Sequence, residues 1–166
     1  MGVGTQTTID AGTYPRILAG RGIASSRIVS QACPGLADTI SEDREGTKTN
    51  AEIRRWVQTA IGKMPDAGAP VVAALACTHY GYRNDFFAAA FAESGVRANV
   101  VNPNERAVDD LFGGAPEGPH RDAVVRFVTR YAIPAATVEA LSWFLQPISP
   151  PTVAALAHFE HLPDLF

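Results

Sequence analysis

The six residues from Val71 to Ala76 are all apolar, and the polar residues Cys77, Thr78 and His79 follow them directly. A short, continuous apolar run is typical of a strand that is covered on both faces. Such strands occur in parallel sheets flanked by helices, where ligands bind beyond the carboxyl ends of the strands. We therefore expect an α/β protein with a candidate site directly after residue 76.

Short β-branched runs alternate with longer helical patterns along the chain, which predicts a parallel sheet with helices on its faces. Strands are expected at Arg27–Ser30, Val71–Ala76, Ala98–Val101 and Ala123–Val128. Helices are expected at Thr13–Ala19, Asn50–Lys63, Asn84–Ser94, Glu105–Leu111 and Ala135–Leu145. The opening residues Gly2–Thr8 resemble the end of a strand and its following loop, either a short edge strand or the remainder of a longer one.

The composition places limits on the partners. The chain has 166 residues with 46% hydrophobic and 19% charged residues, which is enough for a normal core of one domain or slightly more. Its 14 basic and 17 acidic residues give a net charge of −3, and no basic run exceeds Arg54-Arg55, so no nucleic-acid partner is expected. Apolar stretches fall short of the ~20 residues that span a membrane, and the opening lacks a secretion signal, so we expect a cytoplasmic protein.

Two Pro- and Gly-containing segments divide the C-terminal part of the chain. The segment from Gly113 to His120 is rich in turn-forming residues and is the best candidate for a linker. Pro147 to Pro151 forms a second break, and the pattern after it predicts no particular element.

Cys77 and His79 form the strongest candidate for chemistry. If the strand geometry continues past residue 76, both side chains point to one side of the sheet and Thr78 points to the other. A neighbouring imidazole favours the thiolate of a cysteine, whose ordinary pKa is about 8.5, so Cys77 is a candidate acid/base. The alternative is that Cys77 packs as a small hydrophobic residue while His79 caps the loop. Cys33 is the other cysteine, and we expect both to be free thiols.

The segment from Ala74 to Tyr80, Ala-Leu-Ala-Cys-Thr-His-Tyr, resembles the Gly-Cys-Thr-His-Tyr-Pro signature around the second catalytic cysteine of glutamate racemases. Two upstream segments, Ala32-Cys33-Pro34 and Gly4-Thr5-Gln6-Thr7-Thr8-Ile9, also resemble segments of that family and occur in the expected order. The resemblance covers most of residues 2 to 112.

This resemblance implies a cofactor-independent isomerase of the aspartate/glutamate racemase type, without pyridoxal phosphate or a metal. Two cysteines on opposite sides of the substrate would then exchange the α-proton, interconvert L- and D-glutamate, and supply D-glutamate for peptidoglycan. Cys77 would be one of these bases, and Thr78 and His79 would contact the substrate or assist the thiol. Thr5 and Thr8 would line the same pocket and bind carboxylate oxygens through hydroxyl or backbone N–H groups.

The implied fold is a three-layer parallel-sheet domain at residues 1–103 that carries the Cys-Thr-His-Tyr segment. Residues 104–166 would form a C-terminal αβ segment that normally completes a second, similar domain together with an N-terminal half. The implied partners are an acidic amino acid and either a second copy of the chain or that complementary half.

Several residues depart from the family pattern. The first catalytic cysteine of the family lies in an upstream Ala-Cys-Asn-Thr motif that this chain lacks, and we expect a structural role for Cys33. Gly81 stands where the family has proline, and Ser41, with Glu42 beside it, stands where an acidic residue is expected.

These departures leave two alternatives to a racemase open. The chain can be a catalytically incomplete homologue that acts as an interaction module. It can instead be a lyase or isomerase of the same superfamily that works with a single cysteine.

Overall fold

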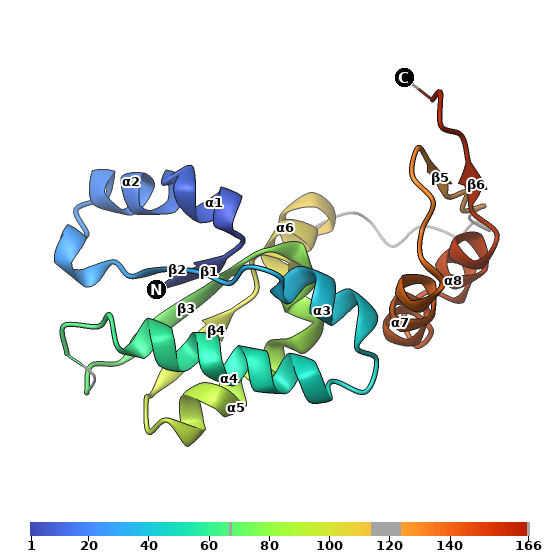
Figure 1. The fold of residues 1–166 in the computed structure, drawn as a ribbon. Coiled ribbons are helices and arrows are strands. Elements are labelled where there is room, and N and C mark those ends of the chain that lie inside the picture. The colour runs from blue at the N-terminus through green and yellow to red at the C-terminus, as the bar shows by residue number, and fades with distance from the viewer. Residues whose placement is uncertain (67, 114–123, 166) are drawn as a thin grey trace. The chain divides into compact units, whose positions relative to one another are not determined.

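The computed structural model describes residues 1–66, 68–113 and 124–165 of the chain (Figure 1). The chain divides into two compact units. The first comprises residues 1–40 and 46–113, and the second comprises residues 41–45 and the C-terminal segment. Within the described residues, no helix is both long and apolar enough to cross a membrane.

A four-stranded parallel sheet forms the centre of the first unit. Its strands are β1 (Gly2–Gly4), β2 (Ser30–Ala32), β3 (Val71–Ala76) and β4 (Ala98–Val101), arranged in the order β2-β1-β3-β4. The pairing register places Gly4 between Ala32 on one side and Ala76 on the other. The predicted α/β fold with a parallel sheet is therefore confirmed, and β3 and β4 have the predicted bounds.

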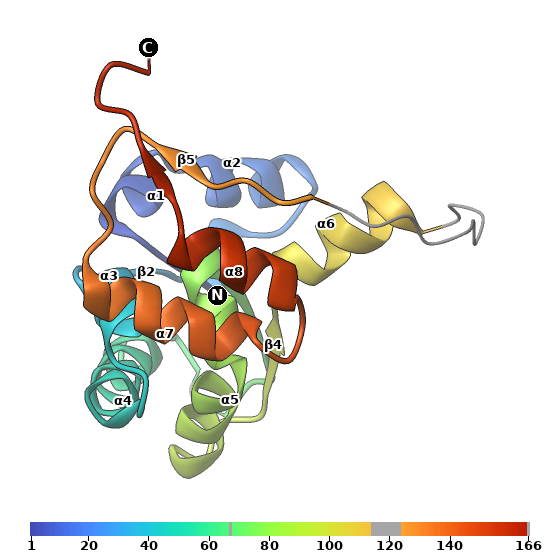
Figure 2. The same cartoon turned by 90° about the vertical axis from the view of Figure 1, so that its right-hand side faces the viewer.

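Helices cover the sheet in layers. The described helices of this unit are α1 (Gln6–Asp10), α2 (Thr13–Gly20), most of α3 (Leu36–Glu42), α4 (Thr47–Ile61), α5 (Asn84–Glu93) and α6 (Pro103–Phe112), with 3₁₀ turns η1 (Ser25–Arg27) and η2 (Thr78–Arg83). Helices α4 and α5 lie on one side of the sheet, and α1 and α2 lie on the other (Figure 2). The sheet thus forms the middle of three layers.

The hydrophobic core lies between the sheet and the α4–α5 layer. On β3, Ala73 and Leu75 are buried whereas Val72 is 59% exposed, so the odd-numbered residues of the strand face this core. Helix α4 contributes Ile53 and Val57, spaced four residues apart on one helix face. Further buried residues come from β1, α3, α5 and the turn after β3: Val3, Leu36, Ile40, Tyr80, Phe87, Ala90 and Phe91.

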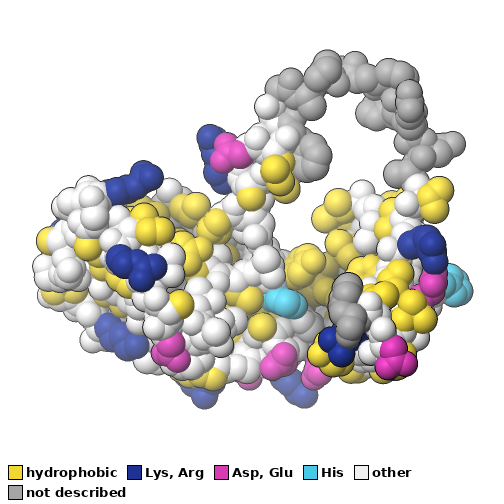
Figure 3. All heavy atoms as spheres, turned by 90° about the horizontal axis from the view of Figure 1, so that it is seen from above, with side chains coloured by type: hydrophobic (Ala, Val, Ile, Leu, Met, Phe, Trp, Pro, Cys, Tyr) yellow, Lys and Arg dark blue, Asp and Glu magenta, His cyan; other side chains and the backbone are white. Residues whose placement is uncertain are grey.

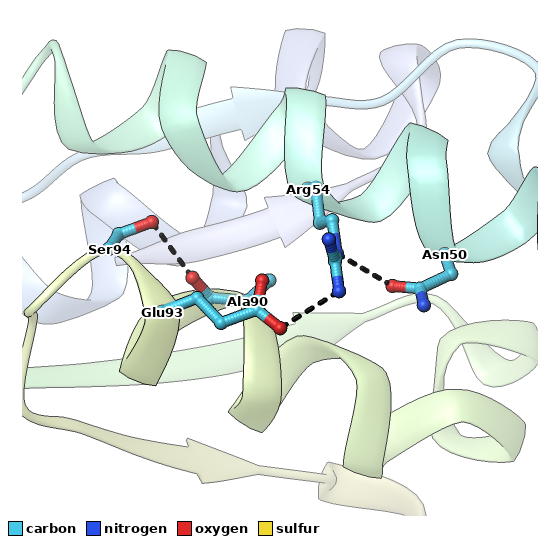
Figure 4. A network of polar contacts seen from close by, with 5 residues as sticks. All are labelled: Asn50, Arg54, Ala90, Glu93 and Ser94. Carbon is cyan, nitrogen blue, oxygen red and sulfur yellow. Dashed lines mark hydrogen bonds and ion pairs between the residues drawn. The ribbon is translucent and has the colours of Figure 1, made fainter.

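Charged side chains lie on the outer surfaces. In the view of Figure 3, Lys and Arg side chains are scattered rather than gathered into one continuous patch. Figure 4 shows one link between neighbouring helices, in which Arg54 of α4 donates to Glu93 of α5 at 2.8 Å and to Asn50 at 3.1 Å. Because Arg54 and Glu93 are both about half exposed, this ion pair contributes ~0–1 kcal/mol. The buried apolar residues therefore hold the two helices together.

The N-terminal third differs from the sequence-based prediction at two places. Residues 6–10 form helix α1, although a loop was predicted, because the Thr5 hydroxyl caps the helix by accepting the Thr8 backbone N–H at 3.3 Å. Strand β2 begins three residues later and ends two residues later than the predicted Arg27–Ser30, since its register with β1 is set at residues 30–32. The predicted bounds of this strand were therefore wrong.

The second unit contains β5 (Val128–Thr129), α7 (Ala135–Leu145), α8 (Pro150–Ala157) and β6 (Glu160–His161), with β5 and β6 paired in parallel.

Helix α7 has the predicted bounds. A strand was also predicted at Ala123–Val128. Residues 124–127 are not in a strand, so the prediction is wrong there, and residue 123 lies outside the described residues. The proposed linker also lies outside them, apart from Gly113. The predicted break at Pro147 to Pro151 falls between α7 and α8, and Pro150 opens α8, since proline is well suited to the first turn of a helix.

Candidate functional site

The carboxyl ends of β1 and β3 bring the predicted site residues onto neighbouring loops. Gly4 pairs with Ala76, so Thr5 and Cys77 are the next residues on the two adjacent strands. A Cβ added at Gly4 would lie 3.4 Å from the Cβ atoms of both Ala76 and Thr8, which shows how closely α1 approaches the sheet here. Ligands of open α/β sheets bind at this edge.

Cys77 and His79 contact each other directly. The Cys77 Sγ lies 3.8 Å from the His79 Nδ1, within the range of a weak hydrogen bond to sulfur, and both residues are partly buried. Cys77 itself is extended, with φ −147° and ψ 135°, and the 3₁₀ turn η2 begins at Thr78. The turn, rather than a continued strand, therefore brings the thiol and the imidazole together.

Thr78 was predicted to point away from this pair, and that prediction is wrong. Its Oγ1 lies 3.5 Å from the same His79 Nδ1, because the 3₁₀ turn replaces the alternation of a strand. Thr78 is exposed, so its hydroxyl is open to solvent beside the imidazole.

Thr5 and Thr8 form a second polar pair at the end of β1. Their Oγ1 atoms lie 2.9 Å apart, and the Thr8 backbone N–H donates to the Thr5 Oγ1. Both residues are partly buried. The register places this pair on the loop next to that of Cys77, although no hydrogen bond among the described residues joins the two.

Cys33 follows β2 and is in a different environment from Cys77. It is 1% exposed, and its backbone N–H donates to the Gly4 carbonyl at 2.9 Å. The buried Tyr80 lies beside it and donates its hydroxyl to the Cys33 carbonyl at 3.3 Å. Burial raises the pKa of the Cys33 thiol to about 12 and also raises the pKa of Tyr80. Cys33 is therefore a protonated, buried thiol at neutral pH, which fits the structural role expected for it.

Residues that the sequence analysis did not select support the Cys77 loop. Asn102 and Asn104 lie at the start of α6, where the Asn102 side chain accepts the Asn104 backbone N–H at 3.2 Å. The Asn104 side chain donates to the Thr78 carbonyl at 3.4 Å. A Cβ added at Gly81 would lie only 2.6 Å from the Asn102 Nδ2. The position of these two asparagines after β4, beside the end of β3, is the signal that could have found them.

Glu42 does not take part in the contacts described above. It is the exposed last residue of α3, and it belongs with Ser41 to the second unit.

The close contact at Gly81 predicts a selective sensitivity to added volume. The substitution Gly81→Ala should lower the free energy of unfolding by about 1–3 kcal/mol, because Asn102 must move or the turn must shift. The matched control is Gly20→Ala in α2, where a Cβ would meet nothing within 4 Å. Urea denaturation should show no loss of stability for this control, because alanine is more favourable than glycine in a helix. Equal effects of the two substitutions would contradict the described packing.

The Cys33 pKa predicts a loss of stability at high pH. The pKa is raised to about 12 in the folded chain, well above the ordinary value of a cysteine, so the folded state retains the proton over the intervening range. The stabilising contribution is complete below about pH 9, and it declines as the pH rises towards 12, by up to ~1.4 kcal/mol per pH unit.

Urea denaturation from about pH 8 to about pH 11 can separate this contribution from those of other groups. The Cys33→Ala variant should lose less stability over that range than the wild-type chain. If the free energy of unfolding falls equally with pH in both proteins, the raised pKa of Cys33 is refuted.

Comparisons with known proteins find relatives of about half of the chain. No family model matches the chain. A glutamate racemase of Roseobacter denitrificans is 36% identical over 90 residues, which is 54% of this chain and 32% of that protein. A glutamate racemase of Jannaschia sp. is 35% identical over 89 residues, covering 54% of this chain and 31% of that protein. The chain thus spans about a third of the length of these relatives, and over half of its own length it is glutamate racemase-like.

Proposed function

We propose that this chain supplies one side of a cofactor-independent racemase site, in which Cys77 transfers a proton at the Cα of glutamate or a similar acidic amino acid. The observation that carries the proposal is the 3.8 Å contact between the Cys77 thiol and the His79 imidazole at the carboxyl end of β3. The likeness to two glutamate racemases supports the choice of reaction.

The chemistry follows from the two groups in contact. An imidazole in contact with a thiol can act as its general base and accept its proton. The resulting thiolate takes the α-proton of the amino acid, so that a C–H bond breaks and an S–H bond forms. The electron pair is left on Cα, where the adjacent carboxylate delocalises it. Return of a proton to the same face restores the original enantiomer.

The neighbouring hydroxyl groups are suited to holding the substrate. We assign Thr5, Thr8 and Thr78 to carboxylate binding, because hydroxyl and backbone N–H groups donate well to carboxylate oxygens. Thr78 has an exposed hydroxyl, and the Thr5–Thr8 pair lies at the end of the adjacent strand. Asn104 would act as a positioning residue, since it donates to the Thr78 carbonyl.

Inversion of the substrate requires a second acid/base group on the opposite face. Cys33 is unsuited to that role because it is buried and its pKa is raised to about 12. By this proposal the second group comes from a complementary segment or from a second copy of the chain. The assembled enzyme would then interconvert L- and D-glutamate and supply D-glutamate for peptidoglycan.

A lyase or isomerase that works with a single cysteine is the second candidate. The observation that favours it is the contrast between the two thiols, of which Cys77 is partly exposed and Cys33 is buried. Such an enzyme exchanges the α-proton with solvent and leaves the configuration unchanged.

The exchange of the α-proton tests the proposal. L- and D-glutamate are incubated separately in D₂O with the full chain, and proton NMR follows the loss of the α-proton signal. We expect measurable exchange that falls by at least ~100-fold in Cys77→Ser, because a positioned acid/base group contributes about that factor or more. The matched control Cys33→Ala should retain exchange within about threefold, since it removes the buried thiol and leaves the reacting one.

Chiral chromatography of the same samples separates the candidates. Exchange with inversion supports a racemase, and exchange with retained configuration supports the enzyme with a single cysteine. If Cys77→Ser exchanges the α-proton as fast as the wild-type chain, Cys77 is not the base. If the wild-type chain exchanges no α-proton, it is not an enzyme by itself, which favours the interaction module.

A further inference from the structure

A concave region lies at the opposite edge of the sheet from Cys77. It is a cavity of about 570 Å³ at the amino ends of β1 and β3. Helix α2, the segment from Ile23 to Val29, and the loop before β3 surround it. A volume of several hundred Å³ is typical of a site for a small molecule.

The cavity is separate from the proposed racemase site. Val71 and Val72 line it at the beginning of β3, whereas Cys77 follows the end of that strand. Ala74 is the lining residue of β3 that lies closest to Cys77 in the sequence, and three steps along a strand at ~3.3 Å each put about 10 Å between them. A molecule in the cavity would therefore not contact the Cys77–His79 pair.

The lining is mainly apolar. Tyr14 and Leu18 are four residues apart on α2 and so share one face of that helix. They are 39% and 38% exposed, respectively, and Ile23 is also 38% exposed, so these side chains remain partly accessible to a ligand. The sheet contributes the apolar residues Val71, Val72 and Ala74 of β3.

Two charged side chains and the N-terminal ammonium of Met1 complete the lining, and they differ in their contacts. The Met1 ammonium donates to the Val72 carbonyl at 2.8 Å. Asp66 accepts the Gly68 backbone N–H at 2.9 Å, so one of its carboxylate oxygens is engaged in the local turn. Arg27 ends the 3₁₀ turn η1, and its guanidinium has no hydrogen bond or ion pair to any side chain in the described part of the chain. Guanidinium groups bind carboxylates through two parallel hydrogen bonds. The cavity thus combines an apolar body with an available cation.

We propose that this cavity binds a small apolar monocarboxylate, with its hydrocarbon or aromatic body against Tyr14, Leu18 and Val72 and its carboxylate on Arg27. The proposal does not depend on the racemase assignment, because it uses none of the residues placed in that site. The binding free energy comes from apolar surface removed from water, and the charge pair with Arg27 selects for an acid over its neutral analogue.

The test uses the full chain labelled with ¹⁵N and two probes of the same shape, 4-phenylbutyrate and the neutral 4-phenylbutan-1-ol. Amide shifts are recorded during titration with each probe. We expect saturable shifts of residues in α2, in 23–29 and at the start of β3, with binding of the acid about tenfold tighter than that of the alcohol.

Three variants make the test specific. The substitution Leu18→Asp places a carboxylate in the cavity and should weaken binding of the acid by at least ~10-fold. The matched control is Ile17→Asp on the same helix, because Ile17 is 52% exposed and does not line the cavity. Arg27→Gln should remove the preference for the acid and leave binding of the alcohol unchanged.

The possible outcomes separate clearly. Saturable binding that Leu18→Asp weakens and Ile17→Asp spares supports the cavity as the site. Shifts that do not saturate, shifts at other elements, or equal losses in the two aspartate variants overturn the proposal. Equal affinity for the acid and the alcohol, unchanged by Arg27→Gln, refutes the carboxylate class.

Discussion

The parallel pairing of β1 with both β2 and β3 determines where the functional groups of the first unit lie. Gly4 pairs with Ala32 and with Ala76, so Thr5, Cys33 and Cys77 are the next residues on three adjacent strands. Residues distant in sequence are thereby gathered at one edge of the sheet. A slip of one residue would turn each side chain to the other face, so the buried Val3 and Leu75 also fix the positions of the polar residues beyond them.

The same pairing places the two cysteines in contrasting surroundings. Cys33 is covered by the core and accompanied by the buried Tyr80, and burial favours its protonated form. Cys77 lies at the boundary of the core, is partly exposed, and contacts His79 through a 3₁₀ turn. Two thiols of identical chemistry therefore differ in access to solvent, and the proposed function assigns proton transfer to Cys77 alone.

The sequence predicted those parts of the fold that have strong local signals. The apolar run Val71–Ala76 and the segment Ala135–Leu145 have their predicted bounds, since their patterns agree with their packing. Helix α1 was missed because its Gln-Thr-Thr sequence has modest helix propensity, and a side-chain cap outside the helix supports it. Strand β2 was misplaced because the β-branched pair Ile28-Val29 resembles a strand, whereas its actual bounds depend on pairing with β1.

The sequence likewise predicted only part of the candidate site. Cys77 and His79 could be selected from the sequence, because a polar segment directly after a buried strand is a local signal. Their contact could be expected, but the 3₁₀ turn that produces it and the position of Thr78 could not. The contact of Asn104 with Thr78 and the close packing of Asn102 on Gly81 depend on how α6 follows β4, which is a tertiary property.

Thiol labelling of the native chain tests the central claim most directly, because the account requires an accessible Cys77 and a protected Cys33. The folded chain is treated with iodoacetamide, and mass spectrometry of its peptides gives the labelling rate of each cysteine. The account predicts labelling of Cys77 in the native state and of Cys33 only after denaturation. Comparable native labelling of both cysteines, or faster labelling of Cys33, would contradict it.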